Sequence, residues 1–511
     1  MRFPRLFVVP SVLLLLATVV GCPGKRQVSN PGAASAESSA DDLLVSAVHQ
    51  LRPENYSIAA AADKPVSLLN SWHGLAPDPS SKTDDAVPQG WIDDTQAIRL
   101  KSENYDLFDA VHIRDAMLTH TIAGYLSTRA SDEVGQASAV FDFVVRNVAL
   151  RGDDDPEIPL GIYRILLLGQ GNPEDRAWVT ASLLRQLRLD SVIVRPKGEK
   201  AAENWLLGVL LKGQVYLFDP RLGLAVPSSD EPTGSTVPAT LTQIIEHPEW
   251  LQGFSVKSDE YPIKVEALKD VDIFPIVEVD WWTRRIRYLE SVLPASDLCV
   301  LSDPLSDSNG REGLLTRLKS AGWVPESLKP WPYPRQQAEA MTKVTPAIKQ
   351  ASDIAMMPFN LPIPFKVGED NKVTLGNPEA KLLRIRTEQL LGKFDDATQR
   401  YLSIRHLEIE PAPVQEIANL NRKGAENAIY WTAICKFEAK EYDAAVEQLN
   451  AYLKRYDRSG QWRFAARALL ADSHAERGRF KEAVDTLERS RSDDPYRLGN
   501  AVRVKRWKAR P

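Results

Sequence analysis

Three polar residues between positions 171 and 220 have types and spacing that could support chemistry. Asp175 follows Gly171-Asn172-Pro173-Glu174 at the start of a helical pattern, Asn204 precedes an apolar run, and Asp219 closes the next apolar run. Two carboxylates and an amide together could form a ligand site. The acids also have structural explanations, because acids suit a first helical turn and Asp219-Pro220-Arg221 suits a tight turn. We favour structural roles over a ligand site.

Hydrophobic periodicity predicts the elements that position these residues. Two helices are expected over 106–150, and a further helix is expected over Glu174–Leu187. A short β-rich run at Ser191–Val194 predicts a strand, and residues 205–219 predict a hairpin that turns at Lys212-Gly213. The polar residues would then stand at the first turn of a helix and at the two ends of a hairpin.

This order of a glycine-rich loop, a helix, a strand and a hairpin ending in Asp-Pro resembles the transglutaminase-like superfamily of papain-like cysteine enzymes. The resemblance covers residues 106–227 and is carried by 171–177, 183–189 and 204–220. It implies an α+β fold in which a helix packs on an antiparallel sheet. In that family a cysteine at the helix start is the nucleophile, a histidine is its base, and an aspartate orients the histidine. The family reactions are acyl transfer at glutamine side chains and hydrolysis of amide bonds.

The family's three catalytic positions fall on Pro173, Asn204 and Asp219 in this sequence. Only Asp219 matches, since proline carries no nucleophile and asparagine is not a base near neutral pH. The unit contains no cysteine, and no histidine occurs between His120 and His247. We therefore expect a catalytically inactive unit with no cofactor and no metal. The alternative is an envelope amidase or peptidase with an unrecognised nucleophile.

Two further candidates are weaker. His112, Asp115 and His120 share a predicted helix, but their spacing does not converge, and a solvated or capped helix face is favoured over a metal site. Trp281-Trp282 followed by Arg284-Arg285 could form a stacking surface, but an amphipathic helix that covers a core is favoured. No phosphate loop or dinucleotide fingerprint occurs.

The first residues indicate where the protein acts. A short basic start and an apolar run lead into Val19-Val20-Gly21-Cys22, which resembles the lipobox of bacterial lipoproteins. The resemblance implies a signal peptide at 1–21, a lipid on Cys22, and an extracytoplasmic protein anchored to a bacterial membrane, on its periplasmic side or at the outer membrane. A plain secretory signal is the alternative. Residues 22–41 are expected to form a flexible tether, and Pro23 leaves the choice of membrane open.

Composition narrows the function classes. The 511 residues carry 63 Lys and Arg against 68 Asp and Glu, a net charge of −5, which argues against a general nucleic-acid binder. Because only the N-terminus holds a long apolar run, a polytopic membrane protein is excluded. The two remaining cysteines, Cys299 and Cys435, are expected to be separate buried thiols.

The sequence patterns on either side of residues 106–227 predict secondary structure less clearly. Residues 42–105 are expected to form an irregular extension after a short helix, and 228–375 a mixed α/β middle region and linker. Within this middle region, helices are expected at 281–293, 310–321 and 336–355, and a strand at 297–301. Residues 496–511 form a basic tail that we expect to be solvated.

Residues 376–495 contain a repeated pattern that resembles the tetratricopeptide repeat. Each instance has a turn residue, an aromatic residue that packs back, and an alanine where two helices cross closely. The turn residues are spaced by 48 and then 38 residues, against about 34 in the family. The corresponding residues are Gly392, Phe394 and Ala397; Lys440, Tyr442 and Ala445; and Gly478, Phe480 and Ala483.

Together these features predict a lipid-anchored, non-catalytic interaction protein. The inactive unit would be a rigid platform, and the helical repeats would offer a concave groove to a peptide or protein partner. A purely structural envelope scaffold is equally compatible with the sequence. No nucleic-acid partner is expected.

Overall fold

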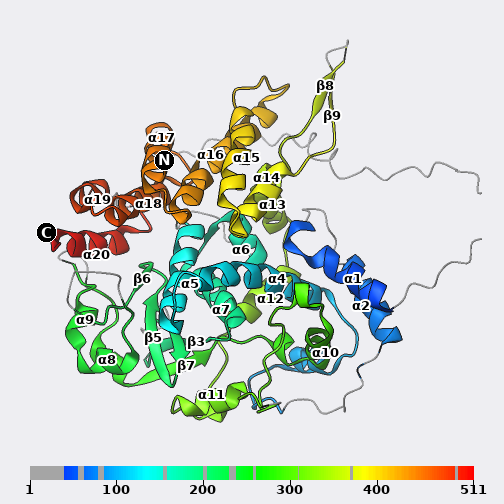
Figure 1. Ribbon diagram of the computed structural model, residues 1–511, viewed down its shortest axis with the longest axis vertical. Helices are drawn as coiled ribbons and strands as arrows, with labels where there is room; N and C mark the ends of the chain where they lie inside the picture. Colours follow the sequence, from blue (N-terminus) through cyan, green and yellow to red (C-terminus); the bar gives the residue numbers. More distant parts are fainter. Residues whose placement is uncertain are drawn as a thin grey trace, which may run out of the picture. The chain divides into compact units, whose positions relative to one another are not determined.

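A five-stranded antiparallel sheet forms the centre of the mixed α+β region (Figure 1). The computed structural model describes residues 40–55, 63–76, 78, 86–152, 158–198, 204–229, 237–256, 260–308, 310–368, 372–488 and 493–510. The proposed signal peptide, Cys22 and nearly all of the proposed tether lie outside these residues. The strands, in spatial order, are β6 (Leu224–Ala225), β5 (Gln214–Asp219), β4 (Leu206–Leu211), β3 (Asp190–Pro196) and β7 (Val271–Pro275).

The expected strand at Ser191–Val194 and the expected hairpin are both present, as β3 and as β4–β5. Lys212 and Gly213 have φ angles of 51° and 76°, the left-handed values that a tight hairpin turn between twisted strands requires. The side chains of β4 alternate between two cores. Leu207 and Val209 pack with the helices on one face, while Leu206 and Leu210 pack with residues of the middle region on the other. Burial on both faces explains why the run is continuously apolar.

Three helices pack on the first face of the sheet region. They are α4 (Leu107–Ser127), α5 (Glu133–Asn147) and α7 (Pro173–Gln186). The short helix α6 (Ile162–Leu168) joins the same core, and the short strands β1 (Ala149–Leu150) and β2 (Gln170–Gly171) pair in parallel before α7.

The N-terminal extension is more helical than its sequence suggests. It contains α1 (Ala40–Leu51), α2 (Asp63–Leu75) and α3 (Asp94–Lys101). Leu44, Leu69 and Trp72 are buried in a core that they share with α4 and α10 (Arg284–Val292). The expectation of an irregular segment was wrong because these helices are short and their apolar faces are completed by distant residues.

The middle region combines short helices with single strands. Its elements after β6 are α8 (Leu241–Glu246), α9 (Pro248–Gln252), β7, α10, α11 (Leu314–Ser320), α12 (Tyr333–Thr342), α13 (Pro346–Met356) and the hairpin β8 (Phe365–Val367)–β9 (Val373–Leu375). The strand expected at 297–301 is absent, because residues 298–301 have no regular structure. The long helix expected over 336–355 is two helices, and Pro346 begins the second.

The C-terminal region consists of three helical hairpins and a final helix. The hairpins are α14 (Lys381–Leu390) with α15 (Phe394–His406), α16 (Gln415–Glu438) with α17 (Tyr442–Tyr456), and α18 (Arg463–Glu476) with α19 (Phe480–Leu487). Consecutive helices pack against each other throughout, as the repeat pattern predicts. No helix among the described residues is long and apolar enough to span a bilayer.

The basic C-terminal segment is a docked helix and not a solvated tail. Helix α20 (Arg497–Lys508) places Val502 in the core on the second face of the sheet, with no exposed surface. Arg503 donates to the carbonyls of Leu222 and Gly223, and Lys505 donates to the carbonyl of Gly253. The basic residues were misleading because several of their donors bind backbone carbonyls.

Both cysteines of the described region are free and buried, as expected. Cys299 lies in the core beside the N-terminal helices, and Cys435 lies in α16. Burial raises the pKa of each thiol to about 12, so neither is a ready thiolate near neutral pH.

Candidate functional site

The start of α7 is built around a capping box. Asn172 is the N-cap: its side-chain oxygen accepts from the Asp175 amide at 2.7 Å, and its own amide donates to the Asp175 carboxylate at 3.0 Å. Pro173 takes the first helical position, where a missing N–H costs nothing. A Cβ on Gly171 would lie 2.7 Å from that of Asp175, so the preceding turn needs glycine. Pro173, at the position compared with the nucleophile, and its neighbours therefore stabilise the first turn of α7.

An aromatic segment closes this helix start from outside. The Tyr333 hydroxyl donates to the Asp175 carboxylate at 2.9 Å and accepts from the side-chain Nδ2 of Asn172 at 3.1 Å. Trp331 stacks on Tyr333 with ring centroids 5.1 Å apart and also packs against Trp205, the first residue after Asn204. Burial raises the pKa of Tyr333 above its usual value, so this hydroxyl remains a donor. Aromatic side chains thus cover the first turn of α7.

Asp219 is fully buried, and its carboxylate is fully engaged. It accepts from the backbone amides of Arg221 at 2.8 Å and Leu222 at 3.2 Å, from the Arg221 guanidinium at 3.1 Å, and from the Tyr261 hydroxyl at 2.5 Å. Arg221 also donates to the carbonyl of Trp205, which joins the two ends of the hairpin. Asn204 is half-buried just before β4. Asp219, the residue that matches the family pattern by type, thus stabilises the turn that follows β5.

Sequence analysis did not single out Arg176, one residue beyond the box. Its side chain is fully buried, and it donates to the carbonyls of Val145, Val148 and Pro220 and to the hydroxyl of Tyr496. It connects α7 to the end of α5, to the turn after β5 and to the C-terminal region. Burial lowers its pKa from the usual arginine value. An arginine at an interior position of an apolar helix was the signal available in the sequence.

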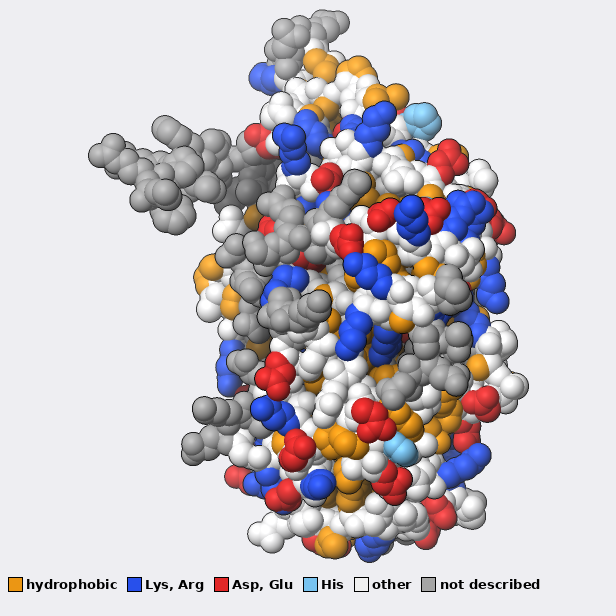
Figure 2. Space-filling view, turned by 90° about the vertical axis from the view of Figure 1, so that its left-hand side faces the viewer, with side chains coloured by type: hydrophobic (Ala, Val, Ile, Leu, Met, Phe, Trp, Pro, Cys, Tyr) orange, Lys and Arg blue, Asp and Glu red, His pale blue; other side chains and the backbone are white. Residues whose placement is uncertain are grey.

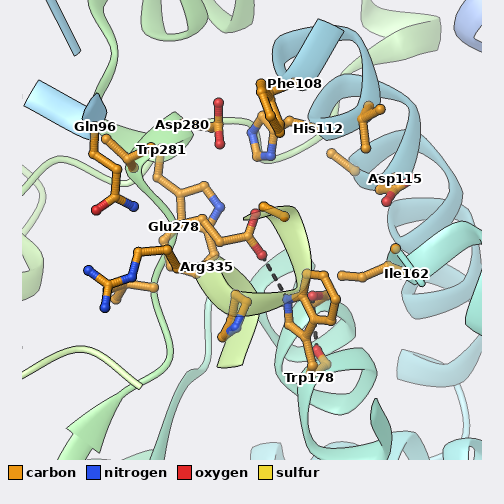
Figure 3. A pocket seen from close by; sticks show the side chains of 18 of the residues that line it. Gln96, Phe108, His112, Asp115, Ile162, Trp178, Glu278, Asp280, Trp281 and Arg335 are labelled. Carbon is orange, nitrogen blue, oxygen red and sulfur yellow. Dashed lines mark hydrogen bonds between the residues drawn. The ribbon is translucent and has the colours of Figure 1, made fainter. Parts of the chain in front are cut away.

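A cavity of about 500 Å³ opens beside another part of α7. Its walls come from α3, α4, α7, the segment 277–281 and α12, and Figure 3 shows side chains from these elements around a shared space. Such a volume is typical of small-molecule sites in proteins. The apolar part of its lining includes Phe108, Ile162, Trp178, Val277 and Trp281.

Most charged groups around the cavity already have a partner. Asp280 accepts from Arg99 at 2.5 Å, and Asp115 pairs with Arg114 at 2.8 Å. Glu278 differs: one of its oxygens accepts from the Trp178 indole N–H at 2.9 Å, but no lysine or arginine of the described chain forms an ion pair with it. Burial raises the pKa of Glu278. The dashed line in Figure 3 marks its bond to Trp178.

The structure corrects the expectation for the histidines of α4. His112 and Asp115 are buried and both line the cavity, whereas His120 is exposed. The His112 Nε2 atom lies 2.8 Å from the carbonyl of Leu301, so this nitrogen carries the proton. No group of acids, histidines and cysteines in the described ranges could hold a metal ion. The helix face that was expected to be solvated is therefore a cavity wall.

The cavity's hydroxyls are bonded within their own helices. Ser182 donates to the carbonyl of Trp178 at 3.0 Å, and Thr119 donates to the carbonyl of Asp115 at 2.7 Å. Within the ranges that the structure describes, neither hydroxyl bonds His112. Trp281 contributes to the wall, and the Arg185 guanidinium lies 4.3 Å from its ring centroid. Trp281 and Trp282 are both buried in the core on the second face of the sheet, as expected for residues that cover a core.

The inner face of the repeats, formed by α14, α16 and α18, is the third candidate site. Arg386 of α14 is fully buried and donates to the carbonyls of Leu166 and Asn147. Glu438 of α16 accepts from Arg129 at 2.6 Å and from Arg146 at 2.7 Å. These contacts join the inner face to α5, to α6 and to the turn that follows α4.

Aromatic packing fills the same face. A Cβ on Gly169 would lie 3.1 Å from Arg386 and 3.4 Å from the Trp462 ring, so the turn after α6 packs closely against both residues. Trp462 stacks on Tyr430 with centroids 4.8 Å apart. Every residue from 427 to 435 of α16 is buried. The groove expected for a partner is therefore occupied by the chain's own mixed α+β region.

The outer face of the repeats, formed by α15, α17 and α19, remains accessible. Its exposed residues are mainly polar and include Gln399, Glu447, Asn450, Lys454 and Asp485. Figure 2 shows acidic and basic side chains interspersed over the face that it draws.

The predicted turn positions share one conformation. Gly392, Lys440 and Gly478 have φ angles of 81°, 63° and 70°. The three aromatic residues Phe394, Tyr442 and Phe480 each begin a second helix, and Ala397, Ala445 and Ala483 have no exposed surface.

One comparison with known proteins gives a match. A tetratricopeptide repeat family model matches residues 427–459, which contain the second half of α16 and all of α17. No curated protein and no solved structure matches the chain. The C-terminal region thus contains a repeat of a kind that mediates contacts between proteins.

Proposed function

We propose that this protein is a lipid-anchored, extracytoplasmic, non-catalytic interaction protein. The observation that carries the proposal is the tetratricopeptide repeat match at 427–459, in a region of three stacked helical hairpins. Repeats of this kind present extended surfaces to protein partners. The lipobox-like sequence that ends at Cys22 supports the anchor and the location.

The mixed α+β region would be a transglutaminase-like unit that has lost its chemistry. The order of α7, β3 and the β4–β5 hairpin supports this assignment. The proline at 173 and the asparagine at 204 supply neither nucleophile nor base. The bonds of Asp175 and Asp219 support this proposal, because both carboxylates hold local structure. The unit would act as a rigid support for the repeats.

The partner would reach the outer face of the repeats, because their inner face is occupied. The exposed residues of α17 carry both charge signs, so we expect a polar contact that weakens with salt. A test is cross-linking in intact cell envelopes with the paired change Glu447→Lys and Lys454→Glu. This exchange reverses the charge pattern of α17 but keeps the net charge. A matched control exchanges Lys319 and Glu326, two exposed residues of the middle region.

The proposal expects at least one partner to be lost with the α17 exchange and retained with the control. Retention of every partner by the α17 variant would overturn the proposed surface. The anchor is tested separately with Cys22→Ser, which should move the protein from the membrane to the soluble fraction. A hydrolase or acyltransferase activity that Asp219→Asn abolished without unfolding the protein would contradict the non-catalytic assignment.

A further inference from the structure

The cavity beside α7 has one charged group whose surroundings are incomplete. Glu278 lies in the wall, between the indole of Trp178 and the imidazole of His112. A buried carboxylate is costly unless a cation or several donors compensate it. Glu278 accepts one hydrogen bond within the described chain, from Trp178, and its withdrawal from water raises its pKa.

The other charges of the cavity do not fill this role. Arg99 is held by Asp106 and Asp280, and Arg185 is held by Asp190 and Asp303. At the rim, Arg335 and Lys343 both pair with Glu339. Each of these arginine and lysine side chains is therefore paired with another acid.

His112 adds a ring nitrogen to the same wall. Its Nε2 donates to the Leu301 carbonyl, and in the tautomer that this bond fixes Nδ1 is an acceptor. Asp115 lies one turn further along α4 and also lines the cavity. The polar groups next to Glu278 can thus accept hydrogen bonds, and Phe108, Ile162 and Trp178 supply apolar surface in the same lining.

We propose that this cavity binds a small organic cation, with an ammonium or guanidinium group at Glu278 and an apolar body against Trp178, Ile162 and Phe108. The cation supplies the charge partner that Glu278 lacks, and the aromatic walls favour both the apolar body and the positive head. The cavity volume of about 500 Å³ accommodates a ligand of the size of a substituted amine. This site is independent of the partner surface on the repeats.

The test is calorimetric titration of the full-length protein with three probes of similar shape: phenethylamine, 2-phenylethanol and 3-phenylpropionate. The proposal predicts saturable binding of phenethylamine and weaker binding of the neutral and anionic probes. Glu278→Gln keeps an acceptor for the Trp178 N–H and should weaken phenethylamine binding at least about tenfold. Glu326→Gln removes the same charge at an exposed position outside the cavity lining and should leave binding unchanged.

A second variant fills the cavity without changing Glu278, which is half-buried. Ala338 lies on α12, lines the cavity and is only half-buried, so Ala338→Trp should fill the space without disturbing a core. It is expected to abolish phenethylamine binding while the unfolding midpoint stays unchanged. The proposal is overturned if the wild-type protein shows no saturable binding of phenethylamine up to about 10 mM. It is also overturned if Glu278→Gln and Ala338→Trp both bind the amine as the wild type does.

Discussion

The inner and outer faces of the repeats use similar charged residues for opposite purposes. On the inner face, Arg386 and Glu438 have no exposed side-chain surface and bond to groups from α5, from α6 and from the turn after α4. On the outer face, Glu447 and Lys454 lie one above the other on α17 and are exposed. A charged residue in a helical repeat therefore does not indicate a binding surface until its bonds are known.

The contrast also explains how the two regions are held together. Arg386 binds neutral carbonyls, whereas Glu438 binds two guanidinium groups, and the two residues lie on different helices of the inner face. Bonds of both kinds require a fixed geometry once water is excluded. We infer that the repeats stay docked on the mixed α+β region through their inner face. A partner must therefore bind their outer face.

Replacing Arg386 should produce the largest effect. Arg386→Ala removes a fully buried side chain and leaves the carbonyls of Leu166 and Asn147 without their donor, so we expect a loss of about 4 kcal/mol in the free energy of unfolding. Denaturant titration measures it. Arg384→Ala, at an exposed position of the same helix, is the control and should cost less than about 0.5 kcal/mol. Equal costs for the two variants would contradict the inner-face contact.

Neutralising Glu438 should have the next largest effect. Glu438→Gln leaves Arg129 and Arg146 without their shared acid, and because both guanidinium groups keep some solvent contact we expect a loss of about 2–3 kcal/mol. Glu447→Gln on the outer face is the matched control and should be nearly silent.

The effect of Glu438→Gln should depend on pH. Although burial opposes ionisation, Arg146 and Arg129 hold the pKa of Glu438 below its usual value. The carboxylate thus stabilises the native state at neutral pH, and this contribution is lost as the pH falls below about 4 through the lowered pKa. The difference between wild type and variant should shrink over that range. If the difference in the free energy of unfolding between wild type and variant grew on acidification, this prediction would be contradicted.

A turn between the two faces should show a smaller effect. Gly478 has a φ angle of 70° and open space around its Cβ position, so Gly478→Ala should cost about 1 kcal/mol through backbone strain alone. Lys440 has a similar φ angle of 63° with a side chain, and Lys440→Gly should stabilise the protein by a few tenths of a kcal/mol. Thermal unfolding of both variants would show whether the two turns respond with opposite signs.

The local elements were predictable because their signals lie within a few residues of each other. Turn preferences were enough to predict the hairpin at Lys212-Gly213, and capping preferences were enough to predict the helix that begins at Pro173. The cavity was not predictable, because Glu278 and α12 reach α4 and α7 only through the tertiary fold. The sequence pointed to His112 and Asp115 on one helix. It did not indicate that the segment 277–281 and α12 lie across a cavity from them.

The occupied inner face had a sequence signal that the repeat pattern obscured. Residues 428–435 of α16 are apolar at nearly every position, which is typical of a helix buried on all sides and not of one lining an open groove. The expectation of an open groove came from the family resemblance alone. The docked C-terminal helix was missed for a related reason, because Arg503 and Lys505 suggested solvent while their partners are backbone carbonyls far away in the sequence.

The most direct test of this account is a double-mutant cycle across the inner face, with Arg146→Met, Glu438→Gln and the double variant. Arg146 belongs to α5 and Glu438 to α16, so their coupling in the free energy of unfolding reports whether the two regions are docked. The account predicts a coupling of more than about 1 kcal/mol. Additive effects within about 0.5 kcal/mol would contradict it, because the inner face would then be free to receive a partner.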